Sequence, residues 1–292
     1  MHEWPLLIFT FLLQAAIGGT LALFYLQGKM EKEMEQGQVY LALKPSAITL
    51  VTLSIVGLIA SFFHLGTPTH AFNLIRHLGS SWMSREILFS GLFIFLLLVT
   101  LFLALKTKGF SRPLLLISGL VGSIAVWTMA ASYADTIHSA WNHAYTYIAF
   151  YANTFTIGAL LIGCLLFAQQ KKVAVNDKIK GALHRLSFFA VTVLLIQIVA
   201  APSYYASLSV GDEAEVASIM LMATSYAGMI LFQWVLLFLG GLGVILVLWK
   251  ADKLQASQLQ SILYLALVVL IIGEFVARYL FYATGLPLGV GF

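Results

Sequence analysis

The chain has 292 residues, of which 61% are hydrophobic and only 10% charged, and its mean hydropathy is +0.94. A composition this apolar excludes a soluble globular protein and is typical of a polytopic helical membrane protein. The net charge of +4 comes mainly from cationic loops, which are expected to face anionic lipid headgroups rather than nucleic acid.

Eight apolar runs follow one another along the chain, each near the length of about 20 apolar residues that a membrane-spanning helix needs. Their length and continuity exclude a β-barrel, whose strands alternate over roughly ten residues. The first run ends in charged residues without a small-residue cleavage site, so we expect an anchor helix there, not a signal peptide. The loops are short. We therefore expect one all-α transmembrane domain over residues 1–292, an eight-helix bundle with helices near 5–27, 43–64, 86–105, 113–134, 147–168, 185–206, 225–249 and 258–282.

Basic residues fall almost entirely in the loops after the first, third, fifth and seventh predicted helices. Only Arg76 and Arg85 lie on the opposite face, and Arg278 lies within the last helix. By the positive-inside rule, both termini are then extracytoplasmic. The cytoplasmic set consists of Lys29, Lys32, Lys44, Lys106, Lys108, Arg112, Lys171, Lys172, Lys178, Lys180, Arg185, Lys250 and Lys253.

The loop between the second and third predicted helices is bounded by two ionisable residues. His64 closes one apolar run and Glu86 opens the next, so both lie at one depth, where lipid gives way to water. An ionisable group at that depth is a functional candidate. Each also suits a helix-capping role, His64 over C-terminal carbonyls and Glu86 at a positive N-terminal dipole end. A lipid-soluble quinol requires such groups as acceptors of its hydroxyl protons.

The sequence lacks the ligands of an internal redox centre. Cys164 is the only cysteine, whereas an iron–sulfur cluster needs four ligands. The predicted spans contain only His64 and His184, at opposite faces, so paired haem ligands are not expected. We expect no haem, iron–sulfur cluster, molybdenum or other metal in this protein. Electrons that it handles must then pass to cofactors in another polypeptide.

The last predicted helix carries Glu274 and Arg278, four residues apart and close to one turn. With the acid first, this spacing favours an ion pair, which would either pin the helix or line a pocket or proton path. Aromatic residues near the predicted span ends, among them Trp141, Tyr145 and Tyr204, are typical of interfacial anchors.

Three stretches carry a resemblance to a known family: His2–Thr10, His64–Ile87 and Gly273–Tyr282. They resemble the membrane anchor subunit of dimethyl sulfoxide reductase, a quinol-oxidising member of the molybdenum oxidoreductase complexes. The resemblance runs from end to end, and His64–Ile87 is its specific part. Ala277 stands where the family tends to have a second glycine before the arginine of the last block.

The resemblance implies a membrane anchor and quinol-oxidising subunit of an anaerobic respiratory dimethyl sulfoxide (S- or N-oxide) reductase in the bacterial inner membrane. Menaquinol is the implied substrate, and a heterotrimer is implied, with an iron–sulfur electron-transfer subunit and a molybdopterin catalytic subunit as partners. We expect the partners on the face carrying His64. The alternatives are the anchor of a related enzyme such as polysulfide reductase, and a polytopic transporter, which would need polar residues at the midplane of several helices.

The family's matching histidine belongs to its quinol site, so the resemblance assigns proton acceptance to His64, with Glu86 sharing that role. Further side chains are candidate quinol contacts, two of them for the ring and three for polar groups or pocket walls: Phe72, Trp82, Arg85, Glu274 and Arg278.

Overall fold

The computed structural model describes residues 4–63, 77–169, 177–250 and 253–289. In these ranges eight helices are long and apolar enough to span a membrane, which confirms the predicted all-α, eight-span fold. The described residues also form a short 3-10 helix, η3 (Ser139–Trp141), and a short helix, α8 (Glu213–Ala223). The long helices are α1 (Trp4–Met30), α2 (Gln36–Phe62), α4 (Trp82–Thr107), α5 (Arg112–Ala134), α6 (Ala144–Ala168), α7 (Asp177–Leu208), α9 (Ala227–Lys250) and α10 (Ala256–Thr284).

Three helices begin at least four residues earlier than their apolar runs predict. α2 starts at Gln36 and α7 at Asp177, because their first turns are polar and extend the helix beyond its apolar run. α4 starts at Trp82, where the Ser81 hydroxyl caps the helix by accepting the Ser84 N–H at 3.3 Å. The sequence suggested that Glu86 is the first residue of this helix. In the structure it lies one turn inside α4.

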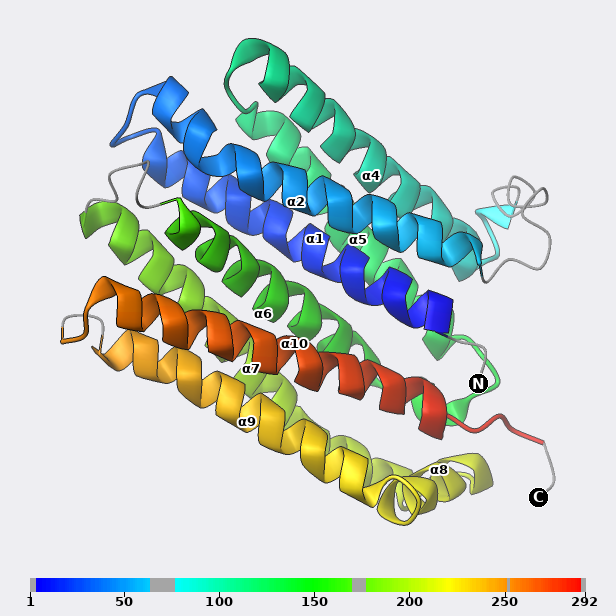
Figure 1. Ribbon diagram of the computed structural model, residues 1–292. Coiled ribbons are helices and arrows are strands. Elements are labelled where there is room, and N and C mark those ends of the chain that lie inside the picture. Colours follow the sequence, from blue (N-terminus) through cyan, green and yellow to red (C-terminus); the bar gives the residue numbers. More distant parts are fainter. Residues whose placement is uncertain (1–3, 64–76, 170–176, 251–252, 290–292) are drawn as a thin grey trace.

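The eight helices form two groups of four that lie side by side (Figure 1). Bundle one consists of α1, α2, α4 and α5, with α1 packed on α2 and α4 on α5. Bundle two consists of α6, α7, α9 and α10, with α6 packed on α7 and α9 on α10. The two bundles meet mainly where α1 packs on α6. α1 is accordingly the most buried of the eight spans.

Glycines let α1 and α6 approach with their backbones in contact. A methyl group on Gly158 would lie 2.6 Å from the Cα of Gly18, and one on Gly18 would overlap the Thr154 carbonyl oxygen. Small residues at such a crossing replace side-chain interdigitation by close backbone packing. The crossing lies one turn from Gln14 on α1 and close to Asn153 on α6, which places these two polar side chains between the bundles.

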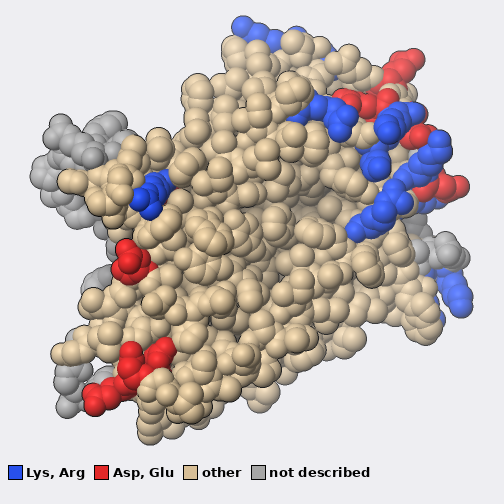
Figure 2. Space-filling view, turned by 180° about the vertical axis from the view of Figure 1, so that it is seen from behind, with Lys and Arg blue, Asp and Glu red and all other residues tan. Residues whose placement is uncertain are grey.

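The two ends of the molecule differ in charge. Most Lys and Arg side chains gather at the end that carries the α1–α2 and α4–α5 connections (Figure 2). The start of α1, the end of α10, η3 and α8 lie together at the other end, here called the α8 end (Figure 1). This separation of charge follows the alternation of basic loops from which the topology was predicted. The compartment that each end faces stays a prediction.

Candidate functional site

Glu86 is a buried carboxylate near the α8 end of bundle one. The residue is 9% exposed, and its carboxylate contacts the Ser132 hydroxyl of α5. Two tyrosines, Tyr133 of α5 and Tyr282 of α10, lie close enough to interact with its charge. The carboxylate is thus held by a neighbouring helix of its own bundle and faces the second bundle.

Tyr133 and Tyr282 join the two bundles. Their hydroxyl oxygens lie 2.6 Å apart, so one donates to the other. Trp141 and Phe281 pack edge-on against the Tyr133 ring, and the Trp141 indole N–H donates to the Phe281 carbonyl at 2.9 Å. This aromatic packing encloses the hydroxyl pair. The charged neighbours of the pair are Glu86 and Arg278.

Arg278 lies one turn before Tyr282 on α10 and connects three helices. Its Nη2 donates to the Gln14 Oε1 of α1 at 2.9 Å, and the Asn153 Nδ2 of α6 donates to the same oxygen at 2.8 Å. The guanidinium carbon stands 3.7 Å from the ring centroid of Phe150, a cation–π contact. The charge is therefore bound by an amide and an aromatic face inside the protein.

The predicted Glu274–Arg278 ion pair is not formed among the described residues. The guanidinium turns toward Gln14 on α1, whereas Glu274 Oε2 accepts the Gln197 Nε2 of α7 at 3.4 Å. Glu274 Oε1 and Gln197 Oε1 are buried without a hydrogen-bond partner within the described part of the protein. Each member of the expected pair is thus bound by a different helix.

Glu274 and Gln197 face a cavity of about 70 Å³ between the helices of bundle two. Helix α8 closes one side through Met222, and α9 contributes Gln233. The remaining walls come mainly from α6, α7 and α10 and combine aromatic rings with one guanidinium, among them Tyr145, Phe150, Tyr204, Tyr205, Phe281 and Arg278.

Two expected interfacial anchors are instead part of the protein interior. Trp141 is 8% and Tyr204 9% exposed. The Tyr204 hydroxyl donates to the Ala140 carbonyl at 3.0 Å, and its ring stacks on that of Tyr145 at 4.7 Å. The anchor interpretation was wrong for both, because Trp141 packs against Tyr133 of α5 and Phe281 of α10, whereas Tyr204 is covered by Ala140 of η3 and Met222 of α8.

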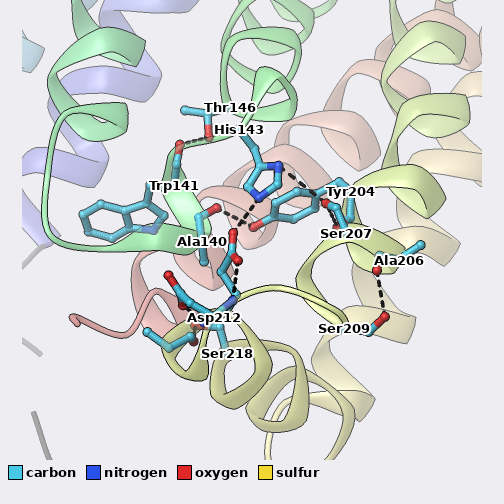
Figure 3. A network of polar contacts seen from close by, with 12 residues as sticks. Ala140, Trp141, His143, Thr146, Tyr204, Ala206, Ser207, Ser209, Asp212 and Ser218 are labelled. Carbon is cyan, nitrogen blue, oxygen red and sulfur yellow. Dashed lines mark hydrogen bonds and ion pairs between the residues drawn. The ribbon is translucent and has the colours of Figure 1, made fainter. Parts of the chain in front are cut away.

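A polar cluster lies beside the cavity at the α8 end (Figure 3). His143 Nε2 lies 2.8 Å from Glu215 Oε1, and both side chains are partly exposed, at 23% and 15%. Glu215 Oε2 accepts the Asp212 backbone N–H at 2.9 Å, while Asp212 accepts the Glu215 N–H at 2.9 Å. This reciprocal capping box fixes the start of α8. The nearby Ser139 hydroxyl and a hydrogen bond from the Glu215 backbone hold the pKa of Asp212 below its ordinary value.

Trp82 and Arg85 organise the segment before α4. The Arg85 guanidinium lies 4.3 Å from the Trp82 ring centroid, and it donates to the carbonyls of Leu78 and Gly79, each at 2.8 Å. Arg85 therefore anchors this segment to the first turn of α4. A contact of either residue with quinol stays a prediction.

The other two candidates, His64 and Phe72, lie outside the described residues. Sequence reasoning missed most of the polar partners that the fold brings together. They are single polar residues within apolar runs, and that placement is the one signal that marks them: Gln14, Ser132, Tyr133, Asn153, Gln197 and Tyr282.

Comparison with known proteins gives one family over nearly the whole sequence. Residues 1–286 match the family described as DMSO reductase anchor subunit (DmsC). The protein is 30% identical to the C subunit of anaerobic dimethyl sulfoxide reductase from Escherichia coli (strain K12). The similarity covers 99% of the present sequence and 97% of that relative. It is 27% identical to the anaerobic dimethyl sulfoxide reductase subunit YnfH of the same strain, over the same shares. The corresponding C subunit from Haemophilus influenzae is 30% identical over 68% of the present sequence and 69% of its own.

Proposed function

This protein belongs to the family of dimethyl sulfoxide reductase anchor subunits, and we propose that it is the quinol-oxidising subunit of such a complex. The family and the eight apolar helices make it a multi-pass membrane anchor. An anchor subunit of a reductase implies electron-transfer and catalytic partner subunits. We further propose that the partners are an iron–sulfur subunit and a molybdopterin subunit, that the substrate is menaquinol, and that the complex lies in the bacterial inner membrane.

The observation that carries the proposal is the placement of Glu86. A carboxylate buried among membrane-spanning helices is costly and typically serves function. Glu86 lies near one end of the bundle, with hydroxyl groups of Ser132, Tyr133 and Tyr282 around it. Such a site offers a quinol both a proton acceptor and a polar neighbourhood, in reach of the interface where protons leave to water.

The reaction assigned to this site balances as follows. Quinol loses both hydroxyl protons and two electrons and becomes quinone. The electrons pass to the iron–sulfur partner, because the anchor sequence has no ligand set for a cluster. Glu86 accepts one proton at its carboxylate and His64 the other at its imidazole, and both protons pass to the aqueous phase at the α8 end. Positioned acid–base groups contribute typically 10²–10⁴-fold to such a step.

The test replaces the acceptor while keeping its shape. In Glu86→Gln, quinol-dependent turnover per assembled complex should fall by about a hundredfold or more, whereas turnover with a water-soluble electron donor that bypasses the membrane should be unchanged. His64→Phe should behave alike. Glu213→Gln, an exposed acid at the first residue of α8, is the matched control and should oxidise quinol normally.

A purely structural role, as a helix cap for His64 or as a packed side chain for Glu86, predicts a different result. Loss of a cap costs about 1 kcal/mol, which lowers the amount of complex but not the turnover of each assembled complex. Unchanged quinol turnover per complex in both Glu86→Gln and His64→Phe would contradict the proposal and move the quinol chemistry elsewhere in the protein.

A further inference from the structure

We propose that the cavity in bundle two is a water-filled proton-exchange site. The Glu274 carboxyl holds the exchangeable proton, and the His143–Glu215 pair forms the outlet at the α8 end. This site is separate from Glu86 and does not depend on quinol oxidation. It would give the anchor a second ionisable centre in contact with water.

The size and lining of the cavity favour water over an aromatic ligand. An engineered apolar cavity of about 150 Å³ admits benzene, whereas a water molecule needs only about 10–15 Å³. The cavity of about 70 Å³ is therefore too small for a quinol ring but has room for a few water molecules. Glu274 Oε1 and Gln197 Oε1 lack partners among the described residues. Buried acceptors of this kind are the groups that internal water satisfies.

The surroundings of Glu274 suit a carboxyl that takes up and releases a proton. The residue is 3% exposed, and its hydrogen-bond donor is the neutral amide of Gln197. The cation on its own helix, Arg278, also lines the cavity and lies close enough to interact with the Glu274 charge. Its guanidinium forms no ion pair with Glu274, because it is bound by Gln14 and stands over Phe150. From α6 the ionisable neighbour is Tyr145. A carboxylate buried without an ion partner is costly, and protonation removes that cost.

A row of polar groups leads from Glu274 to the α8 end. Tyr145 contacts Gln197, and its ring stacks on Tyr204. The His143 ring packs edge-on against the Tyr204 ring, with the two centroids 5.3 Å apart. His143, labelled in Figure 3, is paired with Glu215, and both side chains are partly exposed. Glu274 lies ten residues before the end of α10, so the row spans about 15 Å of helix length.

The direct test observes the proton on Glu274. The assembled complex in lipid nanodiscs is titrated by infrared spectroscopy in H₂O and in D₂O, as wild type, Glu274→Gln and Glu86→Gln. We expect a protonated-carboxyl C=O band that depends on pH, shifts in D₂O, is lost in Glu274→Gln and is kept in Glu86→Gln. Absence of such a band at every pH, or a Glu274 band that does not shift in D₂O, would overturn the proposal.

A second measurement tests the water without altering Glu274. In a Cys164→Ala background, Ala277→Cys places a thiol on the cavity wall, whereas Ala266→Cys places one on the same helix at a site 3% exposed and packed on α9. A small hydrophilic thiosulfonate reagent should label the first at least about tenfold faster, because a packed site must first open locally. Equal labelling rates would show a dry cavity and refute the inference.

Discussion

The crossing of α1 and α6 determines whether the two bundles can share a polar network, and Gly158→Ala tests this. A methyl group at this position would lie 2.6 Å from Gly18 Cα, against the 3.4 Å or more of ordinary contact. Backbone atoms of two packed helices cannot turn aside as a side chain does. The helices must therefore separate by roughly 1 Å to admit the methyl group.

That separation acts directly on the groups between the bundles. The hydrogen bonds Asn153–Gln14 at 2.8 Å and Arg278–Gln14 at 2.9 Å would approach or pass the distance at which they are lost. A neutral bond contributes about 0.5–1.5 kcal/mol and one to a charged group about 1.5–3 kcal/mol. Overpacking itself costs about 1–3 kcal/mol. With these contributions adding, we expect Gly158→Ala to destabilise the protein by about 3–7.5 kcal/mol.

The assay is thermal unfolding of the purified protein in detergent, read by the fraction that stays monodisperse. Gly163→Ala is the matched control, because it lies on the same helix and a methyl group there meets no atom within 4 Å. The control should match the wild type or gain about 0.5–1 kcal/mol from helix propensity. If Gly158→Ala unfolded at the same temperature as Gly163→Ala, the argument that backbone contact positions the network would be wrong.

Three further outcomes are expected. Tyr282→Phe leaves the buried Tyr133 hydroxyl without its partner and should lower stability by about 1–3 kcal/mol; an unchanged unfolding midpoint would show that another group satisfies it. Asp212→Ala removes the capping box of α8 and should cost about 1 kcal/mol. Since the folded pKa of Asp212 is lowered, its contribution is present above the unfolded pKa and lost as pH falls through the folded one. The difference between variant and wild type should therefore vanish in acid, and a difference that persists there would contradict the assignment. Reporter fusions after Phe292 and after Lys172 should indicate opposite compartments, and two cytoplasmic readings would contradict the topology.

The eight spans could be predicted from sequence because lipid leaves a helix few alternatives. Every backbone polar group must be satisfied inside the span, so a long apolar run specifies its own structure. The bounds were less predictable where helices continue into water. α7 begins at Asp177 and not near residue 185, because the polar turn Asp177–Lys180 continues the helix outside the apolar run. Hydropathy marks the membrane, whereas capping and loop geometry mark the helix end.

The site could be predicted only in part, because its members come from separate helices. Glu86 is conspicuous in the sequence as an acid at the edge of an apolar run. Ser132 and Tyr133 are not conspicuous, since hydroxyl groups are common in membrane helices, where they donate to the preceding turn, as Ser132 does to Thr128. Their importance comes from the packing of α4 on α5 and from the approach of α10, and neither is encoded in a local pattern.

Glu274 and Arg278 show why local spacing is a weak guide within a membrane bundle. In an isolated helix, residues four apart are each other's nearest partners, so an acid followed by a base at this spacing forms a pair. In a bundle, each side chain also faces a neighbouring helix, and a polar group there competes with the local partner. Gln14 attracts the guanidinium to α1, and Gln197 binds the carboxylate from α7. The two charges of one helix thereby join it to different bundles: Arg278 ties α10 to bundle one, while Glu274 lies in the wall of the cavity in bundle two, with one carboxyl oxygen unpartnered among the described residues.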